Sequence, residues 1–328
     1  MTAFKHWAVT AVAFAALALP SAALGQAQQP AWPTRSVKLL LPLGAGAGAD
    51  IGARLIAEKL SAKWGQSVVV ENRPGGDGFV AITGFISSND DHMMFLGPAS
   101  SFTAHPYLHD KLPYSMSDLV PVARISATVV ALNAAPSLNA KSVSEVAAMA
   151  KAQPGKLNWA TITGATDLIV EAWLKTAGIE MVKVPYRNPV QALTDVGEGR
   201  LHLYSAAYAI VRPQVQAGRV QMLAVMSSAP FSGLPNVPTV AQAGFPELTF
   251  DGLVGLFGQR GMPMALRERI ANDVKEALAD KALAEKLVAS AQEVVPGGPA
   301  EFAASIDAQF KAIAGIAKTL GLKAATNQ

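Results

Sequence analysis

The stretch "LLLPLGAGAGADIGARL", residues 39–55, decides the fold. It begins as an apolar run typical of a buried strand, and a helical pattern of apolar residues begins near Asp50. Glycines at alternate positions separate the two. Because the first N–H groups of a helix lack partners within it, and glycine lets a ligand approach the backbone, such a turn can bind an anion. The stretch predicts a strand, an anion-binding turn and a helix, with Asp50 capping the helix and pairing with Arg54.

Two other interpretations of this turn stay open. Gly44, Gly46 and Ala49 satisfy the dinucleotide-binding pattern G-x-G-x-x-A, and Glu71 ends the next predicted strand, where an acid that binds a ribose is expected. This pattern makes an NAD-linked oxidoreductase the alternative function, although export would separate the chain from cytoplasmic NAD. The third interpretation is a tight turn that serves packing alone.

The composition narrows the class of protein. The chain has 328 residues, of which 51% are hydrophobic and 16% charged, enough for a large core and two domains. Its formal net charge of +3 gives no reason to expect a nucleic-acid partner. The chain has no cysteine, which excludes disulfides, thiol nucleophiles and cysteine metal sites.

The N-terminus has the pattern of a secretory signal peptide. Lys5 precedes an apolar stretch, and small residues follow in "SAALGQAQ". The apolar stretch is too short to be a membrane anchor. We therefore expect residues 1–27 to form a signal peptide, cleaved near residues 25–27, and the mature protein to be periplasmic.

Strand and helix patterns alternate in two series along the chain. The first series has predicted strands at 36–43, 67–72 and 92–97, and predicted helices at 49–65 and 79–86. A second series of the same kind fills residues 128–226, and helices near 263–292 and 298–320 close the chain. Such alternation predicts an α/β protein with two halves, each a mostly parallel sheet covered by helices. Strands near 125–132 and 250–257 are predicted to cross between the halves.

The strand–turn–helix pattern recurs in "WATITGATDLIVEAW", residues 159–173. Thr161, Thr163 and Gly164 follow a predicted strand, and a helix begins near Asp167. Binding sites in such sheets lie at the carboxyl ends of strands, often between domains. If the two turns face each other, two helix N-termini converge on one cleft.

Hydroxyl and imidazole side chains follow the predicted strand at 92–97. Ser100 and Ser101 can donate hydrogen bonds to a ligand, but they lack the G-x-S-x-G elbow and a triad, so we do not expect a hydrolase. His105 and His109 have a spacing that could hold a metal on a helix. Pro106 and the lack of an evident third ligand favour ordinary loop or surface histidines. No metal and no cofactor are expected.

An ordered set of motifs spans almost the whole mature chain, from about Trp32 to Lys323. The motifs are "WPTRSVKLLLPLGAGAGADIGARLIAEKL", "QSVVVENRPGGDG", "LGPASSFTAHPYLHDKLPYS", "VPYRNPVQALTDVGEGRLHL" and "GLPNVPTVAQAGFPEL". In these motifs the sequence resembles the Bug family, the receptors of tripartite tricarboxylate transporters.

The resemblance implies the type II periplasmic binding protein fold, two α/β domains joined by a two-strand hinge. Domain 1 would comprise residues 33–126 plus 254–328, and domain 2 residues 127–253. A monomeric receptor is implied, which captures a small organic acid and delivers it to the large and small membrane subunits of a secondary transporter. It would not be an enzyme. A sensory subunit that presents its ligand to a membrane kinase is a further alternative.

The expected ligand contacts lie in four segments and involve loop backbone groups above all. They are Leu43, Gly44, Ala45, Gly46, Ala47, Gly48 and Asp50; Ser100 and Ser101; Thr161, Thr163, Gly164, Ala165, Thr166 and Asp167; and Ser205, Ala206 and Ala207. Asp167 stands where members of the family commonly have histidine. An acid beside an anion site repels a second carboxylate, so it favours a monocarboxylate, a ligand with a hydrogen-donating end, or a less polar molecule.

Overall fold

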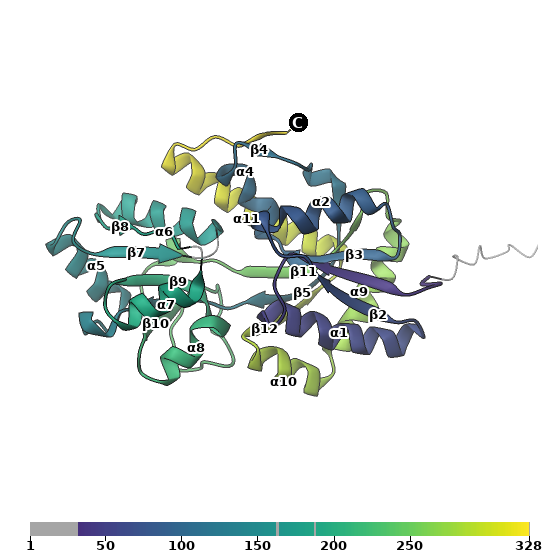
Figure 1. Ribbon diagram of the computed structural model, residues 1–328, viewed down its shortest axis with the longest axis horizontal. Coiled ribbons are helices and arrows are strands. Elements are labelled where there is room, and N and C mark those ends of the chain that lie inside the picture. Colours follow the sequence, from purple (N-terminus) through teal and green to yellow (C-terminus); the bar gives the residue numbers. More distant parts are fainter. Residues whose placement is uncertain (1–31, 162–163, 187, 328) are drawn as a thin grey trace, which may run out of the picture.

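The computed structural model describes residues 32–161, 164–186 and 188–327, which form two lobes side by side (Figure 1). The first lobe contains a sheet with the strand order β12-β5-β11-β3-β1-β2, and the second a sheet with the order β10-β6-β9-β7-β8. A small pair, β4 (Lys111–Leu112) with β13 (Thr326–Asn327), lies apart from both. No helix of the described residues has the length and apolarity needed to cross a bilayer.

The first sheet brings together strands from both ends of the chain. Its strands are β1 (Val37–Leu41), β2 (Val68–Asn72), β3 (Met93–Pro98), β5 (Leu119–Thr128), β11 (Gly252–Gln259) and β12 (Gln292–Gly297). Its helices are α1 (Gly48–Trp64), α2 (Phe79–Ser88), α3 (Ser100–Thr103), α4 (His105–Leu108), α9 (Met264–Leu278), α10 (Lys281–Ala289) and α11 (Pro299–Leu320). Successive side chains of β1 enter opposite layers, as the period of a strand requires. Leu39 packs with Ile56 of α1 on one face, and Leu40 packs with Phe85 and Phe95 on the other.

The second sheet is built from the middle of the chain. Its strands are β6 (Val130–Ala134), β7 (Asn158–Thr161), β8 (Val182–Lys183), β9 (Leu203–Ala207) and β10 (Gln221–Val225). Its helices are α5 (Val143–Ala152), α6 (Gly164–Ala177), α7 (Pro189–Gly197) and α8 (Tyr208–Gln216). The 3-10 helices of the two lobes are η1 (Gly76–Gly78), η2 (Met116–Asp118), η3 (Pro136–Leu138) and η4 (Pro246–Leu248).

Each sheet is mixed. β1 pairs in parallel with β2 and β3, and β7 with β8 and β9, as predicted. The prediction of mostly parallel sheets is wrong for β5, β6, β10, β11 and β12, which pair antiparallel with their neighbours. Parallel neighbours need a crossover connection, whereas β5 passes directly into β6 of the other sheet and no helix reverses the chain between them.

The chain passes between the sheets at two places. β5 ends at Thr128 and β6 begins at Val130. On the return, the N–H of Phe250 donates to the carbonyl of Met226 at 2.7 Å, just before β11 begins at Gly252. These crossings agree with the predicted ones. α11 packs on α6 and places Ile313 in the core of the second lobe, so the last helix contacts both lobes.

Two elements differ from the sequence prediction. The single helix expected over 263–292 is divided into α9 and α10, because Asp280 between them accepts a hydrogen bond from the N–H of Leu283 at 3.0 Å and caps α10. The short helices α3 and α4 were not predicted; each has four residues, too few to show a helical pattern of apolar side chains.

Close packing around β11 leads to a stability prediction. A Cβ at Gly255 would lie 2.3 Å from the ring of Phe302 and 2.6 Å from the carbonyl oxygen of Ala123. We expect Gly255→Ala to lower the free energy of unfolding by about 1–3 kcal/mol in urea titrations, because a backbone atom cannot move aside. Gly315→Ala in α11 is the control. The added Cβ would meet no atom within 4 Å, and alanine is favoured over glycine inside a helix, so this variant should raise the free energy of unfolding by up to about 1 kcal/mol. Equal stability of Gly255→Ala and wild type would contradict this packing.

Candidate functional site

The turn after β1 is held by a buried carboxylate. The predicted cap is wrong, since α1 begins at Gly48 without a side-chain cap. Asp50 instead turns back, and its Oδ2 accepts a hydrogen bond from the N–H of Gly46 at 2.9 Å. Its Oδ1 accepts from the side-chain amide of Asn72 at 2.8 Å and lies 3.1 Å from Nη2 of Arg54, which confirms the predicted pair. Asp50 therefore braces the turn.

Asp50 stays ionised in this setting. Its side chain is only 2% exposed, and burial by itself would raise the pKa. The hydrogen bonds from Gly46, Asn72 and Arg54 outweigh that cost and hold the pKa of Asp50 below its usual value. Asn72 also donates to the carbonyl of Leu43 at 2.9 Å, so one amide ties both ends of the turn.

The turn leaves backbone groups exposed to solvent. Gly44, Ala45 and Gly46 are exposed, and a Cβ at Gly44 or Gly46 would meet no atom within 4 Å. Gly46 has φ +85°, where glycine is strongly favoured. Within the described parts of the chain, the N–H groups of Gly44 and Ala45 have no hydrogen-bond acceptor. They lie beside the start of α1, where the helix dipole favours negative charge.

The loop after β3 lies next to this turn. Pro42 sits 3.3 Å from where Cβ atoms at Gly78 and Gly97 would be, and Oγ of Ser101 is 3.9 Å from the same position at Gly78. Ser101 is buried and Ser100 is half-buried. Pro42, which precedes the first predicted segment, and Ser101 of the second thus both lie near Gly78.

The turn after β7 contacts the first lobe. A Cβ at Gly164 would lie 2.5 Å from Cδ1 of Leu108 in α4, so the start of α6 meets the first lobe there. Asp167 is half-buried, and it accepts a hydrogen bond from Thr161 at 2.5 Å and lies 3.4 Å from the ammonium of Lys183. Its charge is therefore partly balanced within its own lobe. Ala165 and Thr166 are buried; Thr163 lies outside the described residues.

The fourth predicted segment, at the end of β9, is mostly core. Ser205 and Ala206 are buried, and the hydroxyl of Ser205 donates to the sulfur of Met226 at 3.2 Å. Ala207 is half-buried and precedes Tyr208, whose N–H donates to the carbonyl of Val129 between β5 and β6 at 2.7 Å. The side chains of Ser205 and Ala206 therefore pack inside the second lobe, and only Ala207 is partly exposed.

Sequence reasoning missed Gln292, which links the first turn to the strand that leaves the lobe. A Cβ at Gly48 would lie 2.8 Å from Nε2 of Gln292. The Gln292 amide is buried, accepts from Ser126 at 2.9 Å and donates to Thr128 at 2.9 Å. The helix predicted to end near residue 292 gives no sign of a strand there, whereas the structure places Gln292 at the start of β12.

Sequence reasoning also missed the partner of the two histidines. Asp77 Oδ2 lies 3.0 Å from Nε2 of His109 and 3.5 Å from Nε2 of His105. His105 Nδ1 lies 3.0 Å from the hydroxyl of Tyr114, which donates to the carbonyl of Ser101. Burial lowers the pKa of His105 to about 4, and burial raises the pKa of Tyr114. Both are neutral at pH 7, and this cluster adjoins the loop of Ser101.

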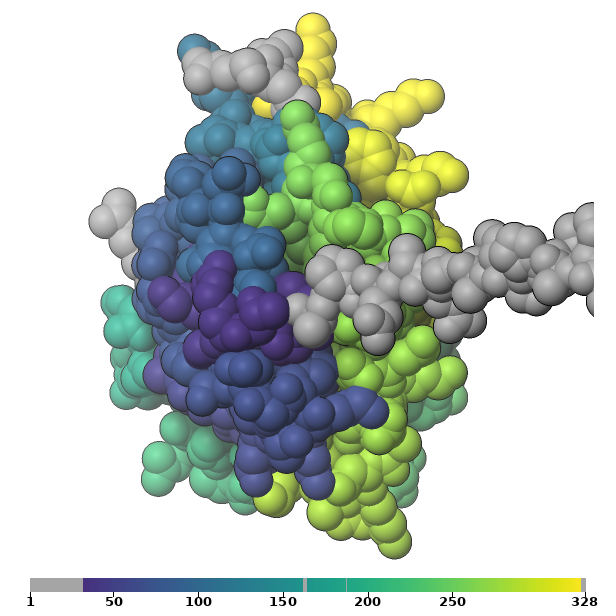
Figure 2. Space-filling model, turned by 90° about the vertical axis from the view of Figure 1, so that its right-hand side faces the viewer, coloured from purple at the N-terminus to yellow at the C-terminus, as the bar shows by residue number. Residues whose placement is uncertain are grey.

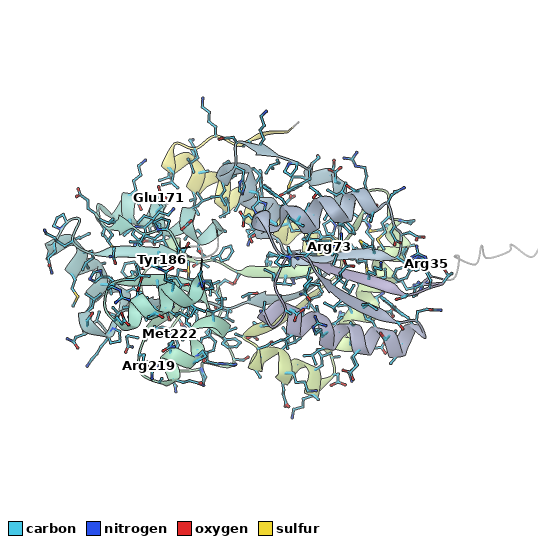
Figure 3. The ribbon with its side chains drawn as sticks, viewed as in Figure 1. Arg35, Arg73, Glu171, Tyr186, Arg219 and Met222 are labelled. Carbon is cyan, nitrogen blue, oxygen red and sulfur yellow. The ribbon has the colours of Figure 1, made fainter. Side chains whose placement is uncertain are left out.

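Two polar side chains near strand ends, Glu71 and Tyr186, each pair with a neighbouring residue. Glu71, the acid that the dinucleotide interpretation assigns to a ribose, lies 2.6 Å from Arg73. The hydroxyl of Tyr186 donates to Asp195 at 2.6 Å, and burial together with this acid raises the pKa of Tyr186 to about 12. Figure 3 shows Arg73 in the first lobe and Tyr186 in the second.

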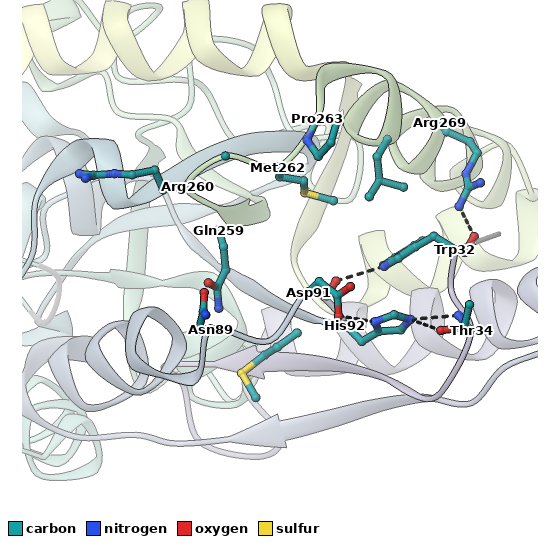
Figure 4. Close-up of a pocket in the computed structure, with 13 residues that line it drawn as sticks. Trp32, Thr34, Asn89, Asp91, His92, Gln259, Arg260, Met262, Pro263 and Arg269 are labelled. Atoms are coloured by element: carbon teal, nitrogen blue, oxygen red, sulfur yellow. Dashed lines mark hydrogen bonds and ion pairs between the residues drawn. The ribbon is translucent and has the colours of Figure 1, made fainter. Parts of the chain in front are cut away.

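A pocket of about 540 Å³ lies at the opposite end of β3 from Ser100. Figure 2 views this end of the first lobe and shows the first described residues beside the segment after β11. Trp32 is central to the pocket: its indole N–H donates to the carbonyl of Asp91 at 3.1 Å, and its own carbonyl accepts from Arg269 (Figure 4). None of the predicted ligand contacts lines this pocket.

Residues 52–322 match the family model described as the tripartite tricarboxylate transporter family receptor. The chain belongs to this receptor family. Its relatives include Protein BugT of Bordetella pertussis, 26% identical over 297 residues, which covers 89% of this chain and 91% of BugT. A UPF0065 protein of Bordetella bronchiseptica is 27% identical over 310 residues, covering 94% and 91% of the two chains.

A solved structure of the same receptor type gives the fold. R. palustris Rpa4515 with adipate superimposes with a TM-score of 0.79 at 28% identity, over 89% of this chain and 99% of that chain. The predicted type II periplasmic binding protein fold is thereby confirmed, as is the resemblance to the Bug family. Members of this family are solute-binding receptors and not enzymes, which argues against the dinucleotide interpretation of the first turn.

The brace at Asp50 predicts a pH-dependent stability. Asp50→Asn should lower the free energy of unfolding at pH 7 by about 1–3 kcal/mol, because an amide NH2 would face the donors that Asp50 now accepts from. The folded pKa of Asp50 is lowered, so its stabilisation is present above the unfolded pKa of about 3.9 and is lost as the pH falls through the folded pKa. Urea unfolding of wild type and Asp50→Asn measures the difference in the free energy of unfolding at pH 7, and again at pH 3, where the difference should be smaller.

The control for this prediction is Glu285→Gln. Glu285 lies on α10 with its side chain 68% exposed and its partner Lys281 3.8 Å away, so little change is expected at either pH. If Asp50→Asn were as stable as wild type at pH 7, the brace would be refuted.

Proposed function

We propose that this receptor binds a small organic acid between its two lobes, with one carboxylate at the turn Leu43–Gly48. The observation that carries the proposal is the exposed pair of N–H groups at Gly44 and Ala45, beside the start of α1 and without an acceptor in the described residues. Backbone donors and the helix dipole bind a carboxylate without a basic side chain. The adipate in the R. palustris relative supports the same class of ligand.

The other three predicted segments also belong to the proposed site, and each has a different role. The hydroxyl of Ser101 lies near Gly78, which also adjoins Pro42 just before the turn, and we assign Ser101 and the adjacent Ser100 the role of donors to the ligand. The start of α6, from Gly164 to Asp167, faces the site from the second lobe in this proposal, and Lys183 partly balances the acid. Ser205 and Ala206 shape the wall from within the core, and Ala207 can contact the ligand.

We propose that ligand binding closes the lobes about the two crossings. Domain 1 is then residues 33–126 plus 254–328, and domain 2 residues 127–253. The closed, loaded form is the one that the large and small membrane subunits of the transporter recognise, since a ligand can act as a signal only by favouring one state. The receptor acts as a periplasmic monomer, exported by the signal peptide in residues 1–27.

Thermal unfolding of the ligand-stripped mature protein against a panel tests the function. The panel holds mono- and dicarboxylates including adipate, aromatic acids, amino acids, and NAD as a control. A ligand at 100 times its dissociation constant adds about 2.7 kcal/mol and raises the unfolding temperature by several degrees. We expect a rise with one class of carboxylate and none with NAD. A rise with NAD alone, or with no acid of the panel, would contradict the proposal.

The variant Gly44→Val tests the place of binding. Gly44 lacks a positive φ, and a Cβ there meets no atom within 4 Å, so the fold should keep its stability while the side chain blocks the backbone donors. We expect at least about a 100-fold loss of carboxylate affinity, equal to about 2.7 kcal/mol. Gly298→Val at the start of α11 has the same open space and should bind as wild type does. Full affinity in Gly44→Val would refute this site.

A further inference from the structure

Three potential metal ligands converge beside α4. Oδ2 of Asp77 and one ring nitrogen from each of His105 and His109 lie within 4.8 Å of one another. Asp77 Oδ2 is 3.0 Å from His109 Nε2 and 3.5 Å from His105 Nε2. Metal bonds of about 2.0–2.1 Å in a tetrahedron place two ligand atoms about 3.3 Å apart. The two distances from Asp77 are thus close to those of a tetrahedral metal site.

The hydrogen bonds of His105 direct a lone pair at Asp77. The single proton of the Tyr114 hydroxyl is donated to the carbonyl of Ser101. The 3.0 Å contact between the Tyr114 oxygen and His105 Nδ1 therefore needs a proton on Nδ1. In a neutral ring, Nε2 then carries the lone pair that faces Asp77 Oδ2, which is itself an acceptor. Two acceptors that face each other are stabilised by a cation between them.

The partner arrangement also matches that of known ligating histidines. A histidine that binds a metal through one nitrogen usually donates its other N–H to a fixed acceptor, which sets the tautomer and orients the ring. Tyr114 provides that acceptor for His105. Phe79 packs edge-on against His105 with ring centroids 5.1 Å apart and so restricts its movement.

A second cluster, of two aspartates and one histidine, lacks this property. Asp90, Asp91 and His92 also lie within 4.8 Å of one another. Arg35 lies 2.6 Å from Asp90 and 3.1 Å from Asp91, and the N–H of Thr34 donates to His92 Nε2 at 2.9 Å. Its acids are neutralised and its ring nitrogens are satisfied. Asp77, by contrast, has no lysine or arginine at ion-pair distance among the residues that the structure describes.

We propose that Asp77, His105 and His109 form a binding site for a divalent transition metal of the zinc type. Two imidazoles and one carboxylate suit Zn²⁺, Co²⁺ or Ni²⁺, whereas Mg²⁺ and Ca²⁺ take oxygen ligands. The side chain of Asp77 is 53% exposed and that of His109 29%, so an ion can enter from solvent and water can complete the coordination. The metal joins η1 to α4 and, through Tyr114, fixes the carbonyl of Ser101.

Titration of the untagged mature protein with Zn²⁺ and Co²⁺ tests the site. We expect one ion per chain, a higher unfolding temperature with Zn²⁺, and the intense visible absorption of tetrahedral Co²⁺. Asp77→Asn and His109→Gln should each lower the affinity about 100-fold or more. Both side chains are partly exposed, and asparagine tolerates the φ of +54° at Asp77, so the metal-free fold should persist. Circular dichroism without metal checks this.

Two further variants make the test specific. Tyr114→Phe removes the acceptor for His105 Nδ1–H and should lower the affinity about 10-fold, a loss expected from an orienting partner. Asp91→Asn, in the second cluster, should bind Zn²⁺ as wild type does. Absence of stoichiometric binding, or wild-type affinity in Asp77→Asn, would overturn the proposal. The titration contains no organic acid, so its outcome is independent of the proposed carboxylate function.

Discussion

The buried carboxylate of Asp50 is the interaction on which the rest of the candidate site depends. It lies at the start of α1, yet it accepts hydrogen bonds from the turn before it, from the end of β2 and from the next helical turn. An ionised group at 2% exposure is tolerable only because these donors surround it. By using the N–H of Gly46, it fixes the turn in a shape that leaves the N–H groups of Gly44 and Ala45 exposed.

The same turn is joined to the crossings between the lobes. Gln292 lies against Gly48 and hydrogen-bonds Thr128 at the last residue of β5. On the other side of the crossings, a space of about 220 Å³ lies between Arg124 and Ala127 of the first lobe and the segment after β10. The buried amide of Gln292 therefore lies between the proposed ligand turn and the first crossing between the lobes.

Much of this architecture follows from local sequence. The apolar run before Pro42, the alternate glycines and the helical pattern after them are each readable over a few residues, and they place the strand, turn and helix correctly. The partners of these elements are not local. Asn72 at the end of β2 reaches Asp50 in α1, and Asp77 in η1 reaches His109 just after α4. Two strands that pair antiparallel, β6 and β11, enter their sheets from the other lobe, which a local pattern of residues does not reveal.

The proposed site places a carboxylate on the backbone of the first turn. The decisive measurement is backbone amide NMR of the 15N-labelled mature protein, titrated with an acid that raises its unfolding temperature. We predict that the amides of Gly44 and Ala45 shift strongly, together with those at the start of α1, while those around Trp32 and His92 stay unchanged. Shifts confined to the pocket at Trp32, with Gly44 and Ala45 unmoved, would contradict it.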